Sequence, residues 1–224
     1  MAVGILSIGL MLVATMFPAA IYLTTVASER TMAAIVADEA FAKIQLFGLQ
    51  TAPSDDVNDY EIGNTNTIDP NEFSYPPVDV NTNNRQYYWS ALFRKIDPNE
   101  YLVTVFVARK TSPNHTYWQW QSGGFYDRPK LSKVAVQAKK DDIELIIQDP
   151  NQAKYINPPT TILDDATGKI YRVIERKIDE PNVVQLDKGW EDTPLPPDHI
   201  WLVPPPESGG KNADIEVFQR IIRF

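Results

Sequence analysis

The sequence predicts an α+β protein in which a long amino-terminal helix precedes a β-rich head of antiparallel strands. Residues 1–28 contain no charged side chain, and residues 29–50 continue as an amphipathic helix without a break. The rest of the chain holds short β-branched and aromatic runs between turns rich in proline and asparagine. We therefore expect a helix over 1–50, a loop and hairpin packed on it over 51–130, and a second small β module over 131–224.

The uncharged run is a candidate membrane span, because about 18 consecutive apolar residues suffice for one. As a continuous helix it would reach roughly 42 Å, which exceeds a hydrocarbon core of about 30 Å. Pro18 lacks an amide hydrogen and predicts a kink or an opened turn. A cleaved signal peptide is one alternative, but no basic segment precedes the run. An ordinary membrane anchor is another, although Arg30, the first cation, gives no clear orientation.

Beyond the uncharged run, apolar residues recur at spacings of three and four. They are Met32, Ile35, Val36, Ala40, Ile44 and Phe47. Gly48 predicts the end of the helix, and Pro53 disfavours any continuation. Such a helix would be roughly 70 Å long and needs a partner along its length. We expect the head to pack on Ile35, Ile44 and Phe47.

The helix begins with the stretch Ala2-Val-Gly-Ile-Leu-Ser-Ile-Gly-Leu-Met-Leu-Val-Ala14, followed by Pro18 and the amphipathic continuation. This pattern, confined to residues 1–50, resembles type IV pilins and type II secretion pseudopilins. The resemblance implies a helix that anchors the subunit in the inner membrane and later bundles in the core of an extracellular filament. The family's basic, glycine-ended leader and fifth-position glutamate are not present. Matching Gly9 to the family's glycine would place Met1 inside the mature chain.

The resemblance implies a structural subunit whose partners are copies of itself or other pilin-like subunits in a helical filament. Filament contacts are heterologous and do not close. Leaving lipid for protein gains little hydrophobic free energy, so close helix packing must supply the cohesion. The expected core contacts are Leu10, Leu12, Phe17 and Leu23, with Pro18 as a flexible point. One alternative is a single-pass, membrane-anchored periplasmic binding or scaffold protein; another is a secreted or anchored enzyme with an unrecognised site.

Composition argues against several other classes of protein. The formal charge of −8 disfavours nucleic-acid binding, which needs a basic stripe to displace counterions. The absence of cysteine excludes disulfides and thiolate metal sites. Neither of the two histidines lies in a known catalytic motif. We therefore predict no catalytic residue and no bound cofactor.

Two weaker signals concern ligands and modification. Asp55, Asp56, Asp59 and Glu61 form an oxygen-rich cluster, and calcium takes six to eight oxygen ligands. The spacing lacks the glycine of an EF-hand loop, so a solvated acidic loop is the preferred interpretation. Asn114 opens the sequence Asn-His-Thr, which is an acceptor for glycosylation in a secreted protein.

The remaining residues predict strands and loops. Residues 86–96 and 101–109 flank a turn at 97–100 and predict a β-hairpin with one face on the helix. Strands are expected over 131–138, 143–148, 169–178, 182–187, 200–203 and 215–222, forming a small antiparallel sheet or partial barrel. The aromatic residues of 111–129 predict either a loop packed on the head or a contact patch for a glycan or another subunit.

Overall fold

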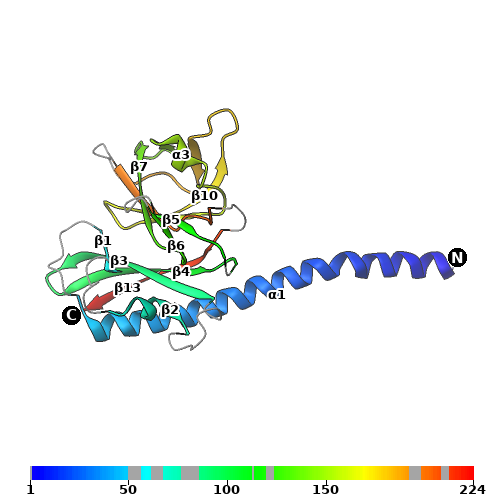
Figure 1. Ribbon diagram of the computed structural model, residues 1–224. Coiled ribbons are helices and arrows are strands. Elements are labelled where there is room, and N and C mark those ends of the chain that lie inside the picture. The colour runs from blue at the N-terminus through cyan, green and yellow to red at the C-terminus, as the bar shows by residue number, and fades with distance from the viewer. Residues whose placement is uncertain are drawn as a thin grey trace.

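The computed structural model describes residues 2–49, 57–61, 68–76, 86–112, 114–119, 124–191, 198–207 and 212–224. They form an α+β protein with one long helix, an antiparallel sheet and a closed six-stranded barrel (Figure 1). The helix lies against one face of the sheet, and the barrel lies against the other. We call the sheet and the barrel together the head.

The helix α1 runs without interruption from Ala2 to Phe47. It stays helical through Pro18, so the opened turn expected there is not seen; a proline removes only one backbone hydrogen bond while those on either side remain. The predicted end is confirmed. Gly48 has φ 72°, and its amide donates to the carbonyl of Ile44 at 2.9 Å. This left-handed cap suits glycine because it has no Cβ.

The sheet is built on the predicted hairpin, which the structure confirms as β3 (Tyr87–Asp97) and β4 (Glu100–Arg109). The strand order is β1-β3-β4-β13, with β2 also paired to β3. The added elements are β1 (Asn58–Asp59), the short helix η1 (Pro70–Phe73), β2 (Ser74–Tyr75) and β13 (Asp214–Arg223).

The barrel closes in the order β10-β11-β8-β7-β12-β9. Its strands are β7 (Ser132–Ala138), β8 (Glu144–Ile147), β9 (Thr161–Asp164), β10 (Ile170–Arg176), β11 (Val183–Leu186) and β12 (Asp198–Leu202). The helix α3 (Pro150–Ala153) follows β8, and β5 (Tyr117–Gln119) pairs with β6 (Gly124–Tyr126) in a separate hairpin. Closure removes the strand edges that a partial barrel would leave open.

The last strand does not belong to the barrel, in contrast to the module expected over 131–224. β13 pairs with β4 from Asp214 to Arg223. The barrel is therefore inserted between two neighbouring strands of one sheet. The side chain of Gln219 ties the two parts together, because its Nε2 donates to Thr104 Oγ1 and to the carbonyl of Gly168, each at 2.8 Å.

The central strand β4 is covered on both faces. On one face of β4, Val103, Val105 and Val107 pack with the buried residues of α1. On the other face, Phe106 and Ala108 belong to a cluster that includes Leu163 and Trp201 of the barrel. A strand buried on both sides reads as a nearly continuous apolar run. This explains why residues 101–109 are so hydrophobic.

Candidate assembly surface on the amino-terminal helix

The carboxyl-terminal half of α1 is packed into the head. The stripe that packs is fully or nearly fully buried and consists of Ala33, Val36, Ala37, Ala40, Phe41 and Ile44. Of the three predicted head contacts, Ile44 lies in this stripe. Ile35 is 44% exposed and Phe47 is 37% exposed, so neither is a core contact. With 3.6 residues per turn, Ile35 lies about 180° around the helix from Ile44, and both cannot face the sheet.

Ion pairs along the same half fix the helix on the head. Lys43 Nζ lies 2.9 Å from Glu72 of η1 and, within the helix itself, 2.6 Å from Glu39. Its Nζ also donates to the Glu72 carbonyl at 3.0 Å. Arg220 of β13 pairs with Asp38 and lies over the ring of Phe41. Each partly exposed pair stabilises the fold by only about 0–1 kcal/mol, so their joint effect is chiefly to set the position of α1.

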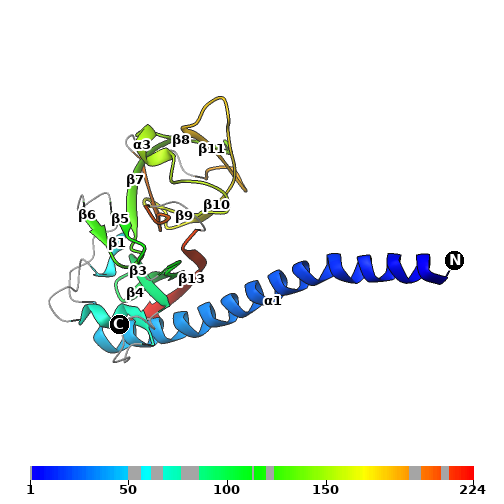
Figure 2. The same cartoon turned by 45° about the vertical axis from the view of Figure 1, so that its right-hand side comes forward.

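The amino-terminal half of α1 extends beyond the head (Figure 2). Its large apolar side chains are exposed at Met11, Met16, Phe17, Ile21, Tyr22 and Leu23. The predicted filament contacts Phe17 and Leu23 are 66% and 65% exposed, and Pro18 is exposed beside them. The side chains of Leu10 and Leu12 lie outside the described residues. Exposed apolar surfaces of this kind are typical of sites that contact another protein or a membrane.

The polar groups within this half are mostly satisfied by the helix itself. Thr24 Oγ1 donates to the carbonyl of Ala20 at 2.8 Å, and Thr25 Oγ1 donates to that of Ile21 at 2.9 Å. Hydroxyls bonded in this way need no outside partner. The threonines therefore do not oppose burial of this surface. Among the residues that the structure describes, no helix combines the length and apolar character required to cross a membrane.

A groove lies where α1 leaves the head. Its apolar and hydroxyl lining comes from α1 (Phe17, Ala20, Ile21, Thr24, Thr25 and Ser28), and Tyr87 closes one side. At its head end, Arg109 at the end of β4 pairs with Glu29, the first charged residue of the chain. We call the part of α1 beyond the head, which includes Met11–Leu23, the bare half, and the part from Ala33 to Ile44 the packed half. The head thus neutralises the charge at the border between these two halves. Sequence reasoning missed this pair because the two residues are far apart in the chain.

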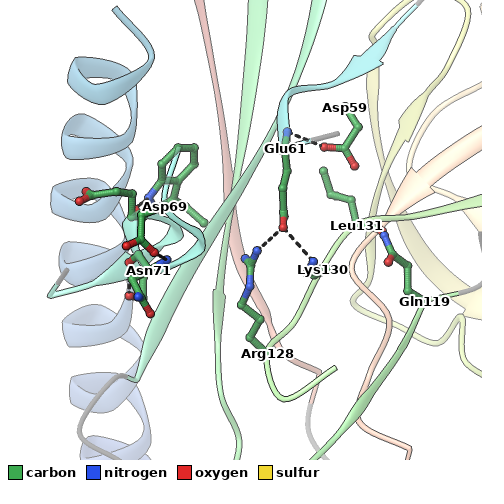
Figure 3. Close-up of polar contacts among 11 residues, drawn as sticks. Asp59, Glu61, Asp69, Asn71, Gln119, Arg128, Lys130 and Leu131 are labelled. Carbon is green, nitrogen blue, oxygen red and sulfur yellow. Dashed lines mark hydrogen bonds and ion pairs between the residues drawn. The ribbon is translucent and has the colours of Figure 1, made fainter. Parts of the chain in front are cut away.

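Glu61, one of the weak candidates for a calcium ligand, is engaged in ion pairs within the fold. Glu61 Oε1 accepts from Lys130 Nζ at 2.8 Å and also from Arg128 (Figure 3). Two cations therefore already compensate this carboxylate. Asp59 Oδ1 accepts the backbone amide of Glu61 at 2.9 Å. Asp55 and Asp56 lie outside the described residues.

The aromatic segment is partly packed and partly exposed. Tyr117 is buried between the sheet and the barrel, in agreement with a loop packed on the head. Trp118 and Phe125 meet edge to face at 4.7 Å on the β5–β6 hairpin, and Phe125 is half exposed. Asn114 is exposed in a turn, and its glycosylation stays a prediction.

A buried carboxylate lies where the chain returns from the barrel to the sheet. Asp214, the first residue of β13, accepts hydrogen bonds from Thr161, and burial raises its pKa from 3.8 to about 7. Although the residue as a whole is only half-buried, its Oδ1 is inaccessible to solvent and has no hydrogen-bond partner. The nearby charged groups are Glu216 and Arg172. Nothing in the local sequence distinguishes this aspartate from a solvated one.

Comparison with known protein families, curated proteins and solved structures finds no match.

Proposed function

We propose that this chain is a structural subunit of a pilus-like extracellular filament that assembles through its amino-terminal helices. The observation that carries the proposal is the contrast along α1, where the half beyond the head keeps its large apolar side chains exposed. In the proposed cycle this half resides in the inner membrane before assembly. It then packs against the helices of neighbouring subunits.

The size of the exposed surface supports an obligatory partner. Burying one large apolar side chain from water contributes about 1.5–3 kcal/mol. Six such side chains are exposed between Met11 and Leu23. A transfer from lipid gains much less, so close contact between helices must stabilise the filament. Ala14, Ala19 and Ala20 in the same segment permit such close approach.

The charges near the head are arranged in a way that suits a packed helix bundle. An unpaired charge in a dry interface is strongly unfavourable. Glu29 is the first charge along the helix, and Arg109 of the same chain already pairs with it. A neighbouring helix that approaches this point therefore meets a neutral pair. The head can remain at the filament surface while the bare half enters the core.

The test is electron microscopy of cells that produce the full chain, with antibody against the head. We expect labelled filaments from the wild type and none from Phe17→Glu, which places a charge on the bare half. Ile178→Glu is the matched control, since Ile178 is 94% exposed on the head and its substitution should leave filaments intact. Unlabelled cells, together with a monomer in detergent, would instead support a membrane-anchored binding or scaffold protein.

A further inference from the structure

The strand β13 forms one border of the sheet (Figure 2). One of its edges pairs with β4 along the whole strand. No strand within the described part of the chain pairs with its other edge. Edge strands of this length present a row of backbone donors and acceptors that another strand can use.

The side chains of β13 that face α1 carry a distinctive charge order. Glu216, Phe218 and Arg220 lie opposite Val107, Val105 and Val103, which belong to the helix-facing core. The order on this face is therefore negative, aromatic, positive. Such a pattern is complementary to itself when it is reversed.

We propose that two copies of this chain pair antiparallel along β13 and form a two-fold symmetric dimer centred on Phe218. In this register Glu216 of each copy lies opposite Arg220 of the other. Directly opposite side chains interact across a strand pair, and opposite charges there are favourable. Antiparallel registers shifted by two residues would place Glu216 opposite Phe218 or Ile222. Parallel pairing in register would place identical charges together, so the charge order selects the antiparallel dimer.

The surrounding charges continue the same alternation. Within one chain, Arg30 lies 3.4 Å from Glu216, and Asp38 pairs with Arg220. Across the proposed interface, the charges alternate in sign. Their order is Arg30 and Glu216 of one copy, followed by Arg220 and Asp38 of the other copy. The two-fold axis repeats this row.

The dimer is distinct from the proposed filament. Antiparallel pairing about a two-fold axis points the two copies of α1 in opposite directions, whereas a bundle of filament helices needs them parallel. A chain paired along β13 is therefore held outside the filament. The dimer rests on the charge order of β13 and not on the proposed function.

A charge-reversal experiment on the full chain in mild detergent tests the interface by sedimentation. We expect the wild type to sediment as a dimer, and Glu216→Lys and Arg220→Glu each to sediment as a monomer because like charges then meet twice. An equimolar mixture of the two variants should restore the dimer, since opposite charges then meet at both positions. Association through α1 would be insensitive to these changes. A monomeric wild type, or a mixture without recovery, would overturn the proposal.

Cysteine cross-linking provides a second measurement, because the chain has no cysteine of its own. Phe218→Cys should form a disulfide-linked dimer on mild oxidation, whereas the exposed control Ile178→Cys should not exceed background. Equal cross-linking of both variants would overturn the proposed register. If filaments form but Phe218→Cys does not cross-link, the dimer is excluded and the proposed function is not. If Phe218→Cys cross-links but no filaments form, the proposed function is excluded and the dimer is not.

Discussion

The two halves of α1 differ in what surrounds them rather than in how helical they are. From Ala33 to Ile44 the helix buries a stripe of small and medium apolar residues on the sheet. From Met11 to Leu23 it exposes larger apolar side chains to its surroundings. In globular proteins, tertiary packing supplies most of the stability of a helix. The described side chains of the bare half lack such packing within the chain, and it is there that we propose a covering partner.

The same comparison explains why the head is needed. Its sheet offers a complementary surface to only one stripe of the packed half, and ion pairs from Lys43 and Arg220 fix that half in place. The bare half has no such pairs among its described residues, and its border carries the pairs of Glu29 with Arg109 and of Arg30 with Glu216. Substitutions at matched positions in the two halves therefore test whether only one half packs on the head.

The largest expected contrast is between two isoleucines. Ile44→Ala should lower the free energy of unfolding of the head by about 2–5 kcal/mol, because it removes buried methyl groups and leaves a cavity. Ile21→Ala, in the bare half, should change it by less than about 0.5 kcal/mol. Urea unfolding followed by tryptophan fluorescence measures both, since Trp89 lies in the same cluster as Ile44. Equal losses would show that the bare half also packs on the head.

The pH dependence of stability should come from the head and not from the bare helix. Because the folded state holds the Asp214 proton more tightly, the stabilisation from protonated Asp214 is complete below pH 3.8 and is lost as pH rises to about 7. The full change is at most about 4 kcal/mol. Asp214→Asn should remove this slope and raise stability at pH 8 relative to the wild type. Denaturant unfolding from pH 4 to pH 8 measures it, and an unchanged slope would refute the assignment.

A smaller contrast concerns two tyrosines. Tyr60 is buried, and its hydroxyl donates to the Gly48 carbonyl at 3.1 Å, just beyond the end of α1. Tyr60→Phe should cost about 1 kcal/mol of stability. Tyr22→Phe should be neutral for the isolated chain because Tyr22 is exposed. Burial also raises the pKa of Tyr60 to about 12, so its ultraviolet titration should fall above that of an exposed tyrosine. A stability loss for Tyr22→Phe as large as that for Tyr60→Phe would count against this contrast.

Local pattern was sufficient to predict some features and insufficient for others. The stop at Gly48 and the hairpin β3–β4 were predictable, because glycine caps and alternating runs act within a few residues. The choice between Ile35 and Ile44 was not, since two overlapping stripes both satisfy helical spacing. The partner of β13 was also hidden, because alternation identifies a strand but not the distant strand that it joins.

Some features of the candidate site could likewise be predicted from local sequence, and others could not. The uncharged run predicted an apolar rod, and exposed Phe17 and Leu23 agree with that prediction. Glu61, for which the sequence favoured a solvated acidic loop, instead pairs with Arg128 and Lys130, which follow it by many residues. Charge compensation across the fold depends on tertiary contacts that spacing along the chain does not specify. The pairing of Glu29 with Arg109 could not be predicted for the same reason, since the two residues are distant in the chain.

A small effect on folding is expected for the pair of Arg109 and Glu29, and this pair gives the sharpest separation of folding from assembly. Arg109→Gln should lower the stability of the isolated chain by at most about 1 kcal/mol, because the pair is partly exposed and screened. In a filament the same change would remove the cation that faces Glu29 next to a packed apolar helix, where loss of a charge partner costs several kcal/mol. Filament yield should therefore fall far more than stability does. Arg109→Gln/Glu29→Gln, which removes both charges, should recover filaments, and failure of this recovery would place the pair outside the assembly surface.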